Sequence, residues 1–137
     1  MDIGRASTRV TIIAATATVA AFSWLAAHES SELELQQLPD GVTSEMVGRG
    51  GDLFRTDALC HACHGVSGKG IRSLGSDLTD DEWTHTDGSY AGTVMIITVG
   101  IKAEDSTSGI PMPPRAGANL SDDQVRAIAA YVWTLSR

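Results

Sequence analysis

The chain has 137 residues, of which 42% are hydrophobic and 5% aromatic, enough for one compact domain of about 100 residues plus a further segment. Its net charge of −7 argues against a nucleic-acid-binding protein, because phosphates are bound by Lys and Arg. The only two cysteines, Cys60 and Cys63, lie three positions apart, which excludes a disulfide framework and points to a site.

Residues 10–27 form an uncharged apolar run that follows two arginines. As a helix it would span roughly 27 Å, close to the ~30 Å hydrocarbon core of a membrane. A cleaved signal peptide is the alternative, but its apolar stretch is usually only ~7–15 residues long, and Leu25 stands where such a cleavage site needs a small residue. We therefore predict a retained signal anchor over residues 1–27 that spans the inner membrane. The positive-inside rule then places the rest of the chain in the periplasm, or on the extracytoplasmic side.

Residues 28–42 are polar and contain a Pro-Asp-Gly turn signal. They are predicted to form a tether. The remaining residues, 43–137, are predicted to form one globular domain.

The first predicted element of this domain is a helix over residues 43–56, with Thr43 or Ser44 as its N-cap. Gly50 and Phe54 are four positions apart and therefore share a face of this helix. Because glycine weakens a helix, its presence there indicates the close approach of a second helix.

Residues 60–78 are predicted to form one helical turn followed by a loop. Residues 89–100 are ambiguous, because their β-branched residues suit a strand. Their apolar residues recur at helical spacing, however, and Gly100 is a suitable C-terminal stop. We therefore predict a helix over this segment.

The last predicted element is a helix over residues 121–135. Ser121 and Gln124 form a capping-box pattern, and acidic residues follow in the first turn, where the helix dipole favours them. Apolar residues then recur at helical spacing. The predicted fold class is all-α, with three to five short helices.

The pattern Cys60-His61-Ala62-Cys63-His64 is the C-x-x-C-H attachment signature for a c-type haem. One helical turn places both thiols on the same side, where they can form thioether bonds to the two vinyl groups of one haem. The next residue, His64, is then carried beneath the ring, where its imidazole can bind the iron. Such attachment takes place outside the cytoplasm, which agrees with the predicted topology.

The motif has three other interpretations. A thioredoxin-like dithiol needs a βαβ context, and no strand pattern surrounds these residues. A zinc site could combine Cys60, Cys63 and His64 with His61 or His85, although such sites usually take their ligands from two separated pairs. A chance occurrence of a short pattern is the third.

A second iron ligand must reach the haem from its opposite face, and Met112 is the favoured candidate. Prolines on both sides restrict the backbone around it, which helps to hold a flexible thioether in place. His85 is the rival ligand. Met46 and Met95 are interpreted as packing residues, and His28 and His61 as surface residues.

The Gly50-x-x-x-Phe54 pattern, the C-x-x-C-H motif and the Pro111-Met112-Pro113 segment resemble those of small bacterial mono-haem cytochromes c of the mitochondrial-like class I. The resemblance covers about residues 47–135. It implies a cytochrome c fold in which the first and last helices cross at Gly50, with Gly50 or Phe54 in contact with Tyr131. The segment 78–89 is most similar to cytochrome domains attached to haem-copper oxidases. That likeness implies that Trp83 packs near the haem propionates, although an ordinary core position is an equal alternative.

One residue departs from the family pattern. The family usually has proline where this chain has Ser76, whose carbonyl is expected to accept a hydrogen bond from the proximal imidazole. Serine keeps the carbonyl but lacks the rigidity of proline, so a looser bond is expected.

The expected function is one-electron transfer by one covalent haem c with His/Met ligation, rather than catalysis. The first hypothesis is a tethered shuttle between membrane respiratory or photosynthetic complexes, with a quinol-oxidising complex, an oxidase, a reaction centre or a dehydrogenase as partner. The second is a fixed haem subunit of such a complex. The third, a gas- or peroxide-binding haem protein, is disfavoured by the methionine between prolines.

Overall fold

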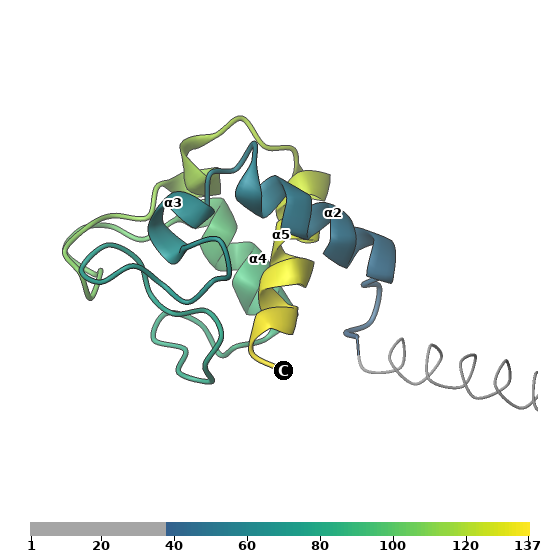
Figure 1. The fold of residues 1–137 in the computed structure, drawn as a ribbon, viewed down its shortest axis with the longest axis horizontal. Helices are drawn as coiled ribbons and strands as arrows, with labels where there is room; N and C mark the ends of the chain where they lie inside the picture. The colour runs from purple at the N-terminus through teal and green to yellow at the C-terminus, as the bar shows by residue number, and fades with distance from the viewer. Residues whose placement is uncertain (1–37) are drawn as a thin grey trace, which may run out of the picture. The chain divides into compact units, whose positions relative to one another are not determined.

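The computed structural model describes residues 38–137, of which residues 39–137 form one compact unit. The predicted anchor and most of the predicted tether lie outside the described residues. Within the described range, no helix is long and apolar enough to cross a membrane. The elements follow in the order α2, α3, α4, the 3-10 helix η1, and α5, which confirms the all-α prediction for this part of the chain (Figure 1).

Helix α2 spans Ser44–Arg55 and confirms the first predicted helix. Its N-cap is Thr43, whose side chain accepts a hydrogen bond from the backbone N–H of Met46. This bond satisfies one of the free N–H groups that every helix start leaves open. The face of α2 that turns inward carries Gly50, Gly51, Leu53 and Phe54.

Helix α4 spans Tyr90–Val99, so the segment that was ambiguous in the sequence is helical. The hydroxyl of Ser89 caps it by accepting a bond from the N–H of Gly92. The helix ends at Gly100, whose φ of 74° suits glycine because it has no Cβ. Burial of Thr93 and Ile97 against the core outweighs the strand preference of the β-branched residues.

Helix α5 spans Asp122–Leu135 and forms the centre of the core. The predicted capping box is present, since the Ser121 side chain accepts from the N–H of Gln124 and the Gln124 side chain accepts from the N–H of Ser121. Its buried residues are Val125, Ala127, Ile128, Ala129, Ala130 and Val132.

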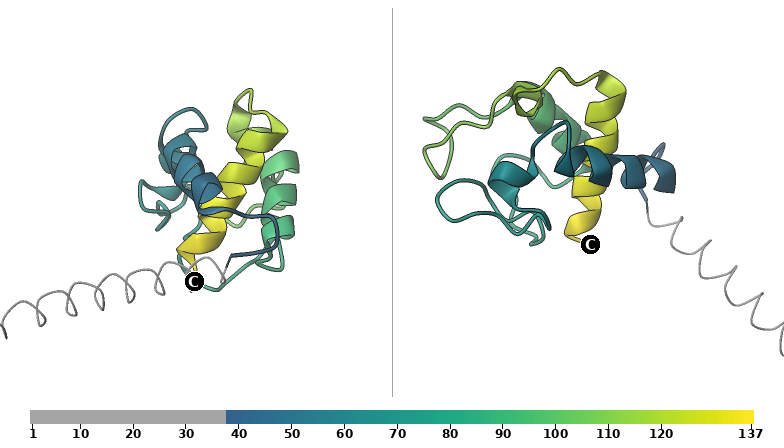
Figure 2. Two further views of the ribbon diagram at one scale, coloured as in Figure 1. Left: turned by 90° about the vertical axis from the view of Figure 1, so that its right-hand side faces the viewer. Right: turned by 45° about the horizontal axis from the view of Figure 1, so that its top comes forward.

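Helix α2 lies across α5 in the views of the ribbon (Figures 1 and 2). A Cβ atom at Gly50 would overlap the backbone carbonyl of Ala127, so only glycine allows the two helices to approach this closely. Beside the crossing, the rings of Phe54 and Tyr131 meet edge to face with centroids 5.3 Å apart. The predicted contact between the first and last helices is therefore confirmed.

Two short elements complete the described fold. Helix α3, His61–His64, is the single turn expected at the cysteine motif. The 3-10 helix η1, Pro114–Gly117, was not predicted. Its Arg115 and Ala116 adopt left-handed backbone angles, with φ of 52° and 56°, for which their residue types give no signal in the sequence.

Candidate functional site

A cavity of about 300 Å³ opens between α3, α4, α5 and the loops that connect them. All four predicted site residues, Cys60, Cys63, His64 and Met112, line it. The rival ligand His85 lines it as well. The remaining wall is largely apolar and comes from residues of the helices and loops, including Phe54, Leu59, Leu74, Leu78, Ile96, Ile97, Ile101, Ile110, Ile128 and Val132.

The two cysteines reach the cavity from one helical turn, and both are free and partly buried. Burial, with a smaller contribution from the neighbouring Cys63 and against a backbone hydrogen bond that lowers it, raises the pKa of the Cys60 thiol to about 11. A thiol of this kind is protonated at neutral pH, unlike the thiolate of a dithiol oxidoreductase. Among residues 38–137, no three side chains of His, Cys, Asp and Glu come together as metal ligands would, so the zinc alternative lacks a ligand set.

The orientation of His64 is set by its Nδ1 atom, which lies 2.9 Å from the backbone carbonyl oxygen of Ser76. A carbonyl oxygen can only accept, so Nδ1 must carry the proton. The other ring nitrogen, Nε2, then has a free lone pair, which is the form of histidine that binds a metal.

The bond from His64 to Ser76 has an ordinary length, although Ser76 lacks the rigidity of the proline that the resemblance leads one to expect there. The reason lies in the preceding residue, because a Cβ atom at Gly75 would overlap the backbone of Cys63. Gly75 also pairs with Ile71 in an isolated antiparallel bridge. Close packing of Gly75 against α3 therefore holds the position of Ser76. The expectation of a looser bond stays a prediction.

Met112 is held by its backbone. Its N–H donates to the carbonyl of Ile101 at 2.9 Å, and the N–H of Ile101 donates to the carbonyl of Met112 at 2.8 Å. Gly100 packs so closely on this pair that a Cβ atom there would overlap the Met112 carbonyl. The partly buried Met112 side chain packs against the core cluster.

The other histidines and methionines differ from these ligand candidates. His61 does not line the cavity; its Nδ1 lies 3.4 Å from the carbonyl oxygen of Phe54, so it is partly buried rather than a plain surface residue. Met46 and Met95 also lie away from the cavity. The interpretation of Met95 as a packing residue is wrong, because it is 51% exposed on α4.

Trp83 provides a test of whether the cavity suits a haem. Its indole lines the cavity and lies against Gly88, yet its Nε1–H group is buried and has no hydrogen-bond partner among the described residues. Buried donors are almost always paired, so this one calls for an acceptor that the described residues do not supply. A haem carries two carboxylates, and the residues of the cavity therefore fit that group. The resemblance predicts a place near the propionates for Trp83, whereas the residue pattern around it carries no such signal.

The family described as cytochrome C oxidase, cbb3-type, subunit III, matches residues 45–132 of this chain. Among curated proteins, the chain is similar to the cbb3-type cytochrome c oxidase subunit CcoP of Rubrivivax gelatinosus, with 33% identity over 81 residues. That alignment covers 58% of this chain and 24% of the relative, so the chain spans about a quarter of the relative's length. No solved structure matches it.

Proposed function

Because the chain belongs to the family of cbb3-type cytochrome c oxidase subunit III, we propose that residues 43–137 form a cytochrome c domain that carries single electrons within a membrane oxidase complex. The name of the relative, an oxidase subunit, favours a fixed subunit over a diffusing shuttle. A shuttle between membrane complexes is the second candidate. In both cases the uncharged run at residues 10–27 would anchor the chain in the inner membrane, with the haem domain outside the cytoplasm.

The observation that carries this proposal is the cavity itself, which is lined by both thiols of a C-x-x-C-H turn, a histidine with a free Nε2, and a methionine fixed by its backbone. Cys60 and Cys63 would hold one haem c by thioether bonds. His64 would bind its iron on one side and Met112 on the other. The haem supplies an iron that alternates between the ferric and ferrous states.

The chain's own residues would adjust this carrier in three ways. The bond from His64 Nδ1–H to Ser76 makes Nε2 a better donor to the metal. A thioether on the opposite side raises the reduction potential and leaves no open coordination position, which agrees with electron transfer rather than oxygen or peroxide chemistry. The apolar wall limits the access of water.

The Met112 assignment is tested with the full chain matured in cells that attach haem c, by comparing the wild type with Met112→Ala. We expect the oxidised wild type to show the weak far-red absorption band of iron–methionine bonds, and the reduced form to resist CO. Met112→Ala should lose the band and bind CO rapidly.

Two variants serve as controls. Met95→Ala removes an exposed methionine that lies outside the cavity, and His85→Ala removes the rival ligand; both should keep the band. A wild type without the band, in which His85→Ala but not Met112→Ala makes the reduced protein bind CO rapidly, would reverse the assignment.

A further inference from the structure

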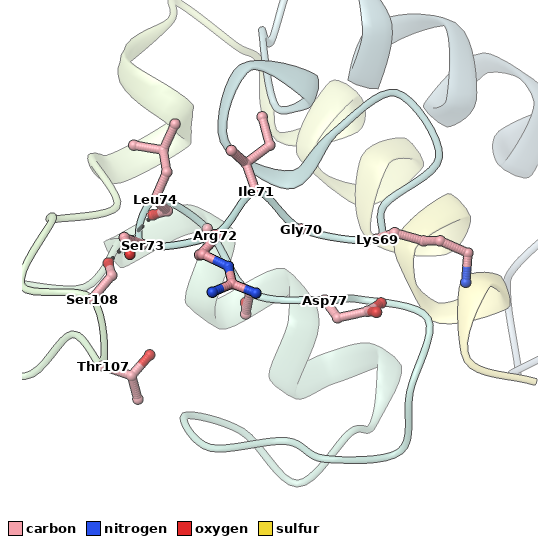
Figure 3. A pocket seen from close by; sticks show the side chains of 11 residues that line it. Lys69, Gly70, Ile71, Arg72, Ser73, Leu74, Asp77, Thr107 and Ser108 are labelled. Carbon is pink, nitrogen blue, oxygen red and sulfur yellow. Dashed lines mark hydrogen bonds between the residues drawn. The ribbon is translucent and has the colours of Figure 1, made fainter.

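Two loops face each other across the mouth of the cavity. One, residues 70–77, contains Ser76, the partner of His64. The other, residues 102–111, is closed at its base by the bridge between Ile101 and Met112. Residues from both loops line the cavity, and they also border a second, polar hollow on the surface beside it (Figure 3).

The hydroxyl of Ser108 joins these loops. It donates a 3.3 Å hydrogen bond to the backbone carbonyl of Leu74, and its side chain points at that backbone (Figure 3). Among the described residues, this is the only hydrogen bond between segments 65–78 and 101–117.

The oxygen of the Ser108 hydroxyl also accepts two hydrogen bonds, one for each of its lone pairs. The Ser106 hydroxyl lies 3.1 Å away, and the backbone N–H of Ile110 donates to it at 3.3 Å. Because a hydroxyl has one proton and two lone pairs, the donation to Leu74 fixes the direction of the other two bonds. Ser108 therefore orders the tip of its own loop as well as joining it to the facing one.

We propose that Ser108 is a positioning residue that fastens the methionine-bearing loop across the mouth of the cavity and thereby keeps Met112 on the iron. The inference rests on the proposed His/Met ligation. Ser108 lies four residues before Met112, and Leu74 lies two residues before Ser76. The hydrogen bond between Ser108 and Leu74 therefore links the loop that carries Met112 to the loop whose Ser76 carbonyl orients His64.

The experiment measures imidazole binding to the oxidised, haem-loaded full chain. Imidazole must displace Met112, so its apparent affinity reports the fraction of protein in which the methionine is off the iron. We expect Ser108→Ala to bind imidazole about fivefold more tightly than the wild type, the factor that one ordinary hydrogen bond contributes at 25 °C. Ser108→Thr, which keeps the hydroxyl, should restore the wild-type value.

The matched control is Ser67→Ala, the same chemical change at an exposed serine outside the cavity wall, whose side chain makes no hydrogen bond to any described residue. It should bind imidazole as the wild type does. Equal affinity in Ser108→Ala and the wild type would overturn the inference, while a wild type without the far-red band would overturn the ligation instead.

A second measurement needs no variant and covers the case in which Ser108→Ala fails to load haem. In the wild type, the amide of Ile110 should exchange its hydrogen more slowly than that of Thr107, because only the former is bonded to the Ser108 hydroxyl. Equal exchange at both amides would contradict the role of Ser108.

Discussion

At the scale of single residues, the bond between His64 and Ser76 depends on the backbone rather than on a particular side chain. The carbonyl that orients His64 belongs to the backbone and is available from any residue type. Its position depends on Gly75, which packs against Cys63. The sequence predicted the bond through the family resemblance, but the supporting contact between Gly75 and Cys63 is visible only in three dimensions.

Asp122 gives a pH-dependent prediction. A hydrogen bond and the positive charge from Arg115, whose guanidinium lies 2.6 Å from the carboxylate, lower the pKa of Asp122 below its usual value of about 3.9. A carboxyl group with a lowered folded-state pKa contributes stability above its unfolded pKa and loses it as the pH falls through the folded value. The wild type should therefore melt at a higher temperature than Asp122→Asn at pH 7, and the difference should vanish at strongly acidic pH.

The measurement is thermal unfolding of both haem-loaded proteins across the acid range. Asp57→Asn serves as the control, since the exposed Asp57 carboxylate has no hydrogen bond or ion pair among the described residues. A difference between wild type and Asp122→Asn that stays constant into strong acid would contradict the assigned role of Arg115.

At the scale of the elements, the crossing of α2 and α5 makes a prediction with an internal control. Gly50→Ala places a methyl group on the Ala127 carbonyl and should destabilise the protein by about 1–3 kcal/mol, as overpacking does. Gly48→Ala, on the exposed side of the same helix, meets no atom within 4 Å and should stabilise by up to about 1 kcal/mol through helix propensity.

Denaturant unfolding of the haem-loaded variants measures both effects. The two substitutions are chemically identical and lie two positions apart, so they differ mainly in what the new methyl group meets. Equal effects of both substitutions would mean that the helices do not cross at Gly50.

The elements also show what the sequence could predict. Helices α2, α4 and α5 were predicted because each has a capping residue next to an apolar stripe, and both signals are local. The 3-10 helix η1 has no such signal, because Arg115 adopts a left-handed backbone and its side chain bonds to Leu120 and Asp122, five and seven positions later, which is outside a helical repeat. The bridge between Ile101 and Met112 and the bond from Ser108 to Leu74 join residues that are far apart in the chain.

At the scale of the whole described domain, the edges of the cavity differ from the rest of the surface. Residues 40–137 carry 8 Lys and Arg against 13 Asp and Glu, yet segments 58–68 and 106–114, which both contribute to the cavity wall, carry none of these four residue types. Leu59 and Ile110, which line the cavity, are 59% and 44% exposed. These two uncharged segments suit docking to an uncharged surface of a membrane complex, although Asp77 and Glu82 line the same cavity.

The prediction is that electron exchange with the membrane complex depends only weakly on salt, because few charges meet at the contact. Leu59→Lys should slow the exchange by about tenfold, through the lost burial of one leucine. Val99→Lys, at a residue that is equally exposed but lies outside the cavity wall, should leave it unchanged. Stopped-flow kinetics at several ionic strengths measure these rates; a steep fall with salt in the wild type would show that charges steer the docking instead.

The central claim is that this chain carries one electron on one covalently bound haem with saturated ligation. Its most direct test is a spectroelectrochemical titration of the purified, haem-loaded full chain, followed by exposure of the reduced protein to CO. We predict one haem per chain that acid and organic solvent do not extract. The titration should follow a single one-electron Nernst curve, and CO should not change the spectrum of the reduced protein. A chain that matures without covalent haem, or a reduced form that binds CO at once, would contradict it.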